Sequence, residues 1–146
     1  MNVDELVSTL SRAKLTGAHE RQVQDAIERA LVDAGAPFSR EVSLGEAGRI
    51  DFEVELPRVP LSAEQLRALT PAGGLTCTPV LPLRPRLGIE IKVQGGLREV
   101  TEQMARYAET GRYTSLLLVT TKRLHRMPPT LCGVPIRVCH LWGAIL

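Results

Sequence analysis

The pattern of apolar residues near the N-terminus has the spacing of α-helices. Residues 2–13 carry an apolar side chain every three or four positions, and Asn2 with Glu5 predicts a capping box at the start of this helix. Residues 18–34 repeat apolar side chains every fourth position, which predicts a second helix. Gly35 is suited to the position just after the last turn of this helix.

The hydrophobic period then shortens to that of β-strands. Residues 38–44 and 50–56 alternate between apolar and polar side chains, which predicts two strands. Residues 45–48 have the composition of a turn, so we expect the two strands to form a hairpin. Residues 87–93 alternate in the same way and predict a third strand.

The segment 57–86 lies between the second and third strands and has no regular period. It holds six of the ten prolines, so only a short helix over residues 62–69 is expected within it. An irregular connection of this length inside a small domain is typically a functional flap or a mobile insertion.

The last third of the chain predicts one more helix and two more strands. Residues 97–109 have an amphipathic helical pattern, and residues 116–119 form a continuous apolar run that suits a strand buried on both faces. A final strand is expected over residues 134–141. The order of elements indicates an α/β fold in a single domain, residues 1–146, with a mixed central sheet flanked by helices.

The composition is that of a globular protein. The chain has 146 residues, of which 44% are hydrophobic, 23% charged and 3% aromatic, so one domain with an aliphatic core is expected. No apolar run approaches the roughly 18 residues of a membrane span, and the N-terminus lacks the pattern of a signal peptide. The three cysteines are odd in number and form no CxxC pair, which favours a reduced, cytoplasmic (intracellular) location.

The net charge of +2 conceals two halves of opposite sign. Residues 1–83 contain 8 basic and 12 acidic residues, whereas residues 84–146 contain 10 basic and 4 acidic residues. A basic half favours a polyanionic partner, although a pI near 8.6 does not by itself identify a nucleic-acid-binding protein. The candidates for phosphate contact are Lys14, Arg21, Arg98, Arg106, Arg112, Lys122, Arg123 and Arg126.

Three charged residues occur on strands that are predicted to lie inside the sheet. Alternation places Glu90 and Lys92 on one face of the third strand, and Asp51 can share that face if the second strand is its neighbour. Mg²⁺ is commonly held by one or two carboxylates together with substrate phosphate. A lysine beside such an ion can orient the attacking water or stabilise developing negative charge. This set of residues therefore points to phosphodiester hydrolysis.

The segment Arg49-Ile50-Asp51-Phe52, followed later by Gly88-Ile89-Glu90-Ile91-Lys92-Val93, resembles the motif of the PD-(D/E)xK nuclease superfamily. That superfamily includes restriction endonucleases, Holliday-junction resolvases and many phage nucleases. The resemblance covers roughly residues 18–122. It implies a restriction-endonuclease-like core, namely a helix, a three-stranded meander, a helix and a strand, and a metal-dependent DNA nuclease, in particular an endonuclease.

The resemblance also implies roles for individual residues. Asp51 and Glu90 would be the metal-binding acids, with the backbone carbonyl of Ile91 as a further ligand. Lys92 would position the nucleophilic water and stabilise the transition state. The expected cofactor is Mg²⁺, with Mn²⁺ as a substitute, and the expected partner is DNA, contacted through basic residues of the C-terminal half. A homodimer is expected, because one small active site cuts only one strand.

Two further residues match positions that occur in branches of the superfamily. Glu20 corresponds to a glutamate from the first core helix, as a catalytic residue and metal ligand, and Gln103 corresponds to a polar residue on the helix after the ExK motif. Two departures accompany these matches. Ile50 stands where proline precedes the first acid, and the insertion at residues 57–86 is longer than in a minimal core.

The charged residues also have structural explanations. Glu90 and Lys92 could form a solvated ion pair on an edge strand. Asp51 could belong to a solvated row of acids with Glu53 and Glu55, and we expect the latter two to be such a row. Their spacing alone does not separate these alternatives from catalysis.

Alternatives remain for the other residues and for the function. Glu20 could complement its helix dipole, and Gln103 could be an exposed helix residue. His125 and His140 lack the spacing of metal ligands, so no zinc site is expected. The apolar C-terminus, residues 141–146, favours a subunit interface. The alternative function is a non-catalytic nucleic-acid-binding module that retains a nuclease-like fold, and a further alternative is an α/β interaction protein with a fortuitous motif.

Overall fold

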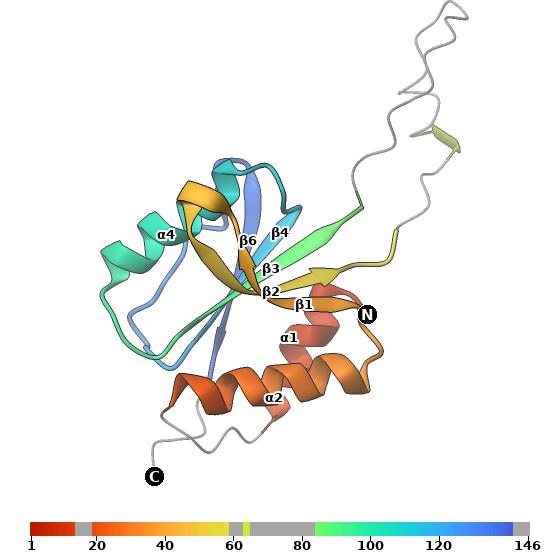
Figure 1. Cartoon of the computed structure of the whole chain (residues 1–146), viewed down its shortest axis with the longest axis horizontal. Helices are drawn as coiled ribbons and strands as arrows, with labels where there is room; N and C mark the ends of the chain where they lie inside the picture. Colours follow the sequence, from red (N-terminus) through yellow and green to blue (C-terminus); the bar gives the residue numbers. More distant parts are fainter. Residues whose placement is uncertain (14–18, 59–62, 65–83, 142–146) are drawn as a thin grey trace, which may run out of the picture.

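The computed structural model describes residues 1–13, 19–58, 63–64 and 84–141, and this part has an α/β fold (Figure 1). Six strands form a mixed sheet in the order β1-β2-β3-β4-β6-β5. The strands are β1 (Phe38–Ser43), β2 (Arg49–Glu55), β3 (Arg86–Lys92), β4 (Ser115–Thr120), β5 (Thr130–Leu131) and β6 (Val134–His140). The helices are α1 (Val3–Arg12), α2 (Glu20–Asp33) and α4 (Leu97–Glu109), with a short 3-10 helix η1 (Gly45–Ala47).

The sheet combines an antiparallel half with a parallel half. β1 pairs antiparallel with β2, and β2 pairs antiparallel with β3. β3, β4 and β6 then run parallel to one another, and α4 is the connection between the first two of these. The short strand β5 pairs antiparallel with β6 at the far edge. The predicted hairpin and the predicted buried strand are therefore confirmed, and η1 lies within the turn predicted at residues 45–48. β5 was not predicted.

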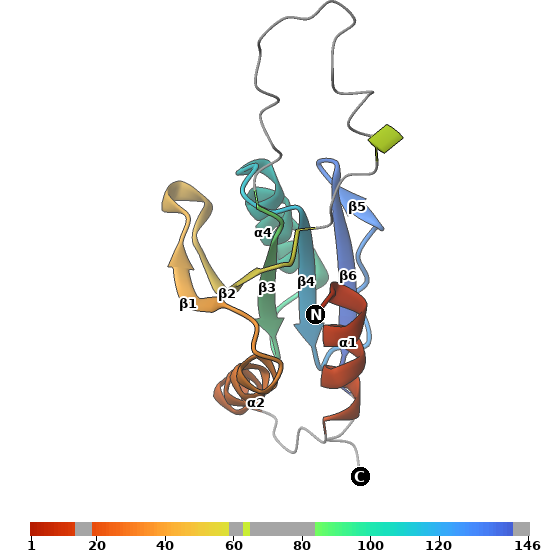
Figure 2. The same ribbon diagram turned by 90° about the vertical axis from the view of Figure 1, so that its right-hand side faces the viewer.

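Helices cover both faces of the sheet. α1 and α2 lie on one face and α4 lies on the opposite face, as the two perpendicular views show (Figures 1 and 2). The capping box predicted at the start of α1 is confirmed, because Asn2 and Glu5 exchange side-chain to backbone hydrogen bonds of 2.8 and 2.9 Å. α4 begins at Leu97 and follows the N-cap residue Gly96, which provides no side-chain hydrogen bond.

Each face of the sheet has its own apolar core. On the α1 and α2 side, buried helix residues pack against β-strand residues such as Phe52 and Ile89. On the α4 side, Met104 and Tyr107 pack against a second set that includes Ile50 and Leu118. β4 contributes to both cores. β3 lies between β2 and β4 and is buried along almost its whole length, which confirms that the third strand is central and covered rather than an edge strand.

The β1–β2 hairpin does not keep the regular alternation that its sequence predicts. Phe52 belongs to the core on the α1 and α2 side, whereas Ile50, two residues earlier, belongs to the core on the α4 side. Residues two apart in a regular strand share one face, so the hairpin rotates between these positions. Glu41, which lies between the paired positions of β1, has a φ of 50°, a left-handed conformation that few residues adopt. This rotation sets the direction of the Asp51 side chain.

Several predictions fall wholly or largely outside the described residues. They concern most of the 57–86 insertion, the short helix over 62–69, Lys14 and the C-terminal residues beyond 141. Among the residues that the structure does describe, no helix is long and apolar enough to cross a membrane.

Candidate active site

The candidate site lies where β2 and β3 separate. Phe52 pairs with Ile89 in the antiparallel register, and beyond this pair the side chain of Asp51 enters the gap between the strands. Its Oδ2 accepts a hydrogen bond from the Ile91 N–H at 2.8 Å. The N–H and C=O groups of one strand residue point to the same neighbouring strand, so the Ile91 carbonyl faces this gap as well.

Glu90 is the most buried carboxylate of the site, with 3% of its surface exposed. Its Oε1 accepts hydrogen bonds from Lys92 Nζ at 3.2 Å and from Gln103 Nε2 at 2.9 Å. Its other oxygen, Oε2, is buried without a hydrogen-bond partner. Burial and, next, repulsion from Asp51 raise the pKa of Glu90 to about 7. The sequence-based alternative of a solvated ion pair on an edge strand is therefore wrong.

Asp51 is the second carboxylate of the site and is half-buried. Burial is the largest cause that raises its pKa, and the negative charge of Glu20 adds to this effect. The Ile91 N–H and the Lys92 ammonium act in the opposite direction. Gln24, from α2, donates a hydrogen bond from Nε2 to Asp51 Oδ1 at 3.3 Å. Asp51 therefore touches both α2 and β3, although these elements are far apart in sequence.

Two polar side chains of α4, Gln103 and Tyr107, lie next to Glu90 of β3. They lie one helical turn apart, and Gln103 Nε2 also donates to the Tyr107 hydroxyl at 2.6 Å. The Tyr107 hydroxyl has a single proton, which it donates to the Arg49 carbonyl at 2.7 Å. Tyr107 therefore donates no hydrogen bond to Glu90 Oε2. The two groups are nevertheless close enough for the Glu90 charge to raise the pKa of Tyr107.

The structure brings Asp51, Glu90, Lys92 and Gln103 into one cluster. Glu20 lies in the first turn of α2, exposed, and acts on Asp51 through its charge. Two residues at this cluster were missed by the sequence analysis, Gln24 and the hydroxyl of Tyr107. Tyr107 lies within the amphipathic pattern of residues 97–109, which predicts only apolar packing for it, and Gln24 is an ordinary helix residue without a local signal.

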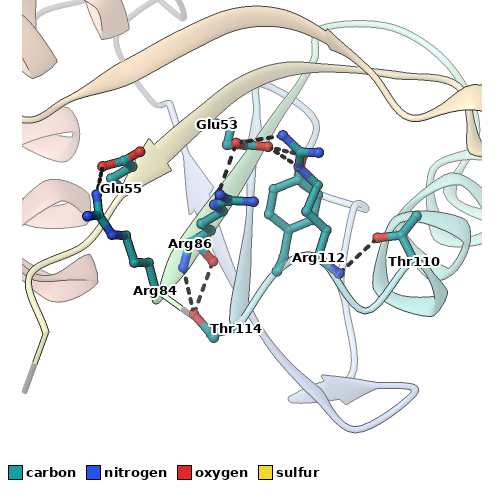
Figure 3. Close-up of polar contacts among 8 residues, drawn as sticks. Glu53, Glu55, Arg84, Arg86, Thr110, Arg112 and Thr114 are labelled. Carbon is teal, nitrogen blue, oxygen red and sulfur yellow. Dashed lines mark hydrogen bonds and ion pairs between the residues drawn. The ribbon is translucent and has the colours of Figure 1, made fainter. Parts of the chain in front are cut away.

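The expectation that Glu53 belongs to a solvated row is wrong. Glu53 is buried and accepts two hydrogen bonds from the Arg112 guanidinium, at 2.6 and 3.0 Å, and a third from the Tyr113 hydroxyl at 3.0 Å (Figure 3). These donors hold the pKa of Glu53 below its usual value despite burial. Only Glu55 stays partly exposed, where it pairs with Arg84 at 3.6 Å.

Figure 3 shows that this second cluster joins the end of β2 to the beginning of β3 and to the segment before β4. Arg112 was a candidate for phosphate contact, but its guanidinium is bound to a carboxylate instead. Arg86 lies 3.8 Å from the same Glu53 carboxylate, and its backbone N–H donates to Thr114 Oγ1 at 3.1 Å. The cluster therefore links β2, β3 and the segment before β4 close to the two ends of the insertion.

The donor set of the candidate site suits a hard cation with few protein ligands. Within the described ranges, no three His, Cys, Asp or Glu side chains stand close enough together to hold a metal ion. A cation beside Asp51 and Glu90 would therefore take two carboxylates, a backbone carbonyl and water, which is the pattern of Mg²⁺ rather than of structural Zn²⁺. The unpartnered Oε2 of Glu90 is the specific observation that favours such an ion, because buried polar atoms are nearly always paired.

His125 is not part of this site, and its environment is structural. It is buried, and its two ring nitrogens contact Thr120 Oγ1 at 2.8 Å and the Gly95 carbonyl at 3.0 Å. The ring therefore links the segment after β4 to the segment after β3. His140 contacts the His125 backbone carbonyl at 3.2 Å.

Comparison of the chain with protein-family models, with curated proteins and with solved structures finds no match. The features that bear on its function are therefore its own residues, above all the two carboxylates and the ammonium group that meet where β2 and β3 separate.

Proposed function

We propose that the chain is a metal-dependent DNA nuclease of the PD-(D/E)xK type, which hydrolyses phosphodiester bonds. The observation that carries the proposal is the convergence of Asp51 and Glu90, with Lys92 at 3.2 Å from Glu90. Such a cluster costs stability, because Glu90 is buried, Asp51 is half-buried, and the Asp51 charge disfavours ionisation of Glu90. A purely structural role would be served better by apolar residues.

The order of elements supports the restriction-endonuclease-like core. α2, the antiparallel strands β1 to β3, α4 and β4 follow one another along the chain as that core requires. Asp51 lies on the second strand of this series, and Glu90 and Lys92 lie on the third. The two motif segments, separated by more than thirty residues in the chain, are adjacent in the sheet.

The residues of the site have separate tasks in the proposed reaction. Asp51, Glu90 and the Ile91 carbonyl would hold Mg²⁺, which supplies a more acidic bound water and offsets negative charge on the phosphate. Lys92, whose ammonium group lies 3.2 Å from Glu90 Oε1, orients the attacking water or a phosphate oxygen. Gln103 holds Glu90 Oε1 through its amide, and so fixes the direction of the carboxylate. Glu20 lies at the margin of the site, where its charge acts on Asp51.

The test is a plasmid-nicking assay with Mg²⁺, Mn²⁺ or EDTA. Wild-type protein is expected to nick DNA only with a divalent ion. Asp51→Asn and Lys92→Gln each remove a charge with only a modest change in side-chain size. They are expected to lower the rate of nicking by at least about a hundredfold. The matched controls are Asp33→Asn, at the end of α2, and Arg29→Gln, on its exposed side, which should cleave like wild type.

A second readout does not depend on turnover. Mn²⁺ binding, followed by electron paramagnetic resonance or calorimetry, is expected for wild type and weakened in Asp51→Asn and Glu90→Gln. Equal cleavage by wild type and by the site variants would refute the catalytic assignment. DNA binding without cleavage and without Mn²⁺ binding would instead support the non-catalytic nucleic-acid-binding module.

A further inference from the structure

A groove opens next to the candidate site, at the ends of β3 and β4. It has a volume of about 810 Å³ and lies between residues 95–97 and residues 121–126. Because β3 and β4 run parallel, the segments that follow them leave the sheet at the same edge (Figure 1). The groove is therefore built by two segments that are distant in sequence.

The loop on one side of this groove, residues 121–126, is fixed by hydrogen bonds of a buried side chain. His125 is 2% exposed and connects Thr120 to the Gly95 carbonyl through its two ring nitrogens. The backbone N–H of His125 donates to the Lys122 carbonyl at 3.1 Å and closes a turn. Leu124 lies within that turn, so its outward direction follows from an anchored backbone.

The outward side chains of the loop combine positive charge with apolar surface. Lys122, Arg123 and Arg126 are exposed and line the groove, and none of the lining residues is acidic. Leu124 is 78% exposed, and Leu97, on the opposite side, is 43% exposed. The Glu99 carboxylate lies beside Gly95, one of the residues that line the groove.

The groove begins a few residues beyond the candidate site along both β3 and β4. Lys92 and Thr120 are opposite each other in the parallel register of β3 and β4, and paired residues in a sheet share one face. The hydroxyl of Thr120 holds His125 and also accepts a hydrogen bond from the Lys122 N–H at 3.0 Å. One strand of a polymer bound at Lys92 therefore has the groove as its next surface.

We propose that this groove binds the sugar–phosphate backbone of one DNA strand and that Leu124 packs against an unpaired base. The placement rests on the proposed function, because it takes the scissile phosphate to lie at Lys92. Cations spaced along a groove neutralise phosphates, and an apolar side chain among them fits a base face that is unstacked. Base faces are stacked inside a continuous duplex, so the chain should prefer single-stranded or branched DNA.

The experiment measures DNA binding in EDTA, where cleavage does not take place. Fluorescence anisotropy would be recorded for a labelled single strand, a forked DNA and a blunt duplex of equal length, over a series of salt concentrations. Wild type is expected to bind the single strand and the fork more tightly than the duplex. Substitution of Lys122, Arg123 and Arg126 by Gln together is expected to weaken all binding at least tenfold and to reduce the salt slope on single strands by about 2.

Leu124→Ala tests the contact with the base separately from charge. It is expected to weaken binding of the single strand and the fork roughly fivefold and to leave duplex binding unchanged. Its matched control is Val32→Ala, which truncates an apolar side chain that is 61% exposed on α2. The control for the charge variant replaces three exposed arginines elsewhere by Gln, namely Arg12, Arg29 and Arg58.

Three outcomes would overturn the proposal. The first is equal DNA binding by wild type and both loop variants. The second is a loss of affinity that the control variants share. The third is binding of the protein to anionic lipid vesicles or heparin that depends on the loop and is as tight as binding to DNA, with no preference for DNA that has unpaired bases. Normal loop-dependent binding in EDTA without cleavage in Mg²⁺ would leave this inference standing and reject only the nuclease activity.

Discussion

The Glu90 carboxylate should make the metal-free protein less stable as the pH rises. Its pKa is raised from 4.5 in the unfolded chain to about 7 in the folded chain. The folded state therefore holds a proton that the unfolded state releases between these two values. This contribution to stability is complete below pH 4.5, is lost as the pH rises toward about 7, and stays absent at higher pH.

The size of the effect follows from the shift. A difference of about two and a half pKa units corresponds to about 3 kcal/mol at 1.36 kcal/mol per unit. Glu90→Gln removes the titration and keeps an oxygen acceptor for Lys92 and Gln103. The amide NH₂ would take the buried position of Oε2, where it lacks a partner, at a constant cost of about 1–3 kcal/mol. The informative quantity is therefore the difference in pH dependence between the two proteins.

The assay is urea unfolding in EDTA at pH 5 and at pH 8. Between these values wild type should lose about 2.5 kcal/mol more unfolding free energy than Glu90→Gln, because the first part of the effect falls below pH 5. Addition of Mg²⁺ at pH 8 should stabilise wild type more than the variant, because the ion favours the charged carboxylate. Parallel pH profiles for the two proteins in EDTA would refute the reasoning, since Glu90 would then ionise in the folded protein as it does in the unfolded chain.

Three other substitutions test separate parts of the structure. Glu53→Gln should lower the unfolding free energy in urea by about 1–2 kcal/mol, because it weakens charged hydrogen bonds to a buried carboxylate whose arginine partner is partly exposed, whereas the exposed pair of Glu55 makes Glu55→Gln nearly neutral. The Glu53 contribution should also disappear in acid, as the pH falls through its lowered pKa. Gly88→Ala should destabilise by about 1–3 kcal/mol, because a Cβ there would lie 2.6 Å from a core isoleucine, while Gly96→Ala has open space and should cost about 1 kcal/mol or less. Tyr107→Phe removes the donor to the Arg49 carbonyl and should reduce kcat in the nicking assay about tenfold with little change in KM; an unchanged kcat would show that the hydroxyl does not position the site.

Much of the secondary structure could be predicted from the sequence because each signal is local. The helical spacing of apolar residues placed α1, α2 and α4 to within about two residues of their ends, and the capping pair at Asn2 needs only three further residues. The continuous apolar run that became β4 indicated a strand covered on both faces, as the two cores show. β5 has only two residues, too few for a periodic pattern.

The rotation of the β1–β2 hairpin could not be read from the chain. The alternation around Asp51 and Glu53 looks regular in the sequence, yet neighbouring apolar residues face different cores. Glu53 therefore looked like a solvated acid, whereas it meets Arg112 from a segment 59 residues later. The sequence contained both partners, but only the tertiary fold decided that they pair.

For the candidate site, too, some features follow from the sequence and others only from the tertiary structure. The sequence by itself determined which residue types were present, two acids and a lysine on strands, and that Glu90 and Lys92 share a face. Only the tertiary structure decided that Asp51 enters the gap beside Ile91 and that Glu90 is buried with one oxygen unpaired. The physical reason is that periodicity is set by neighbouring residues, whereas convergence and burial depend on how strands and helices distant in the chain pack together.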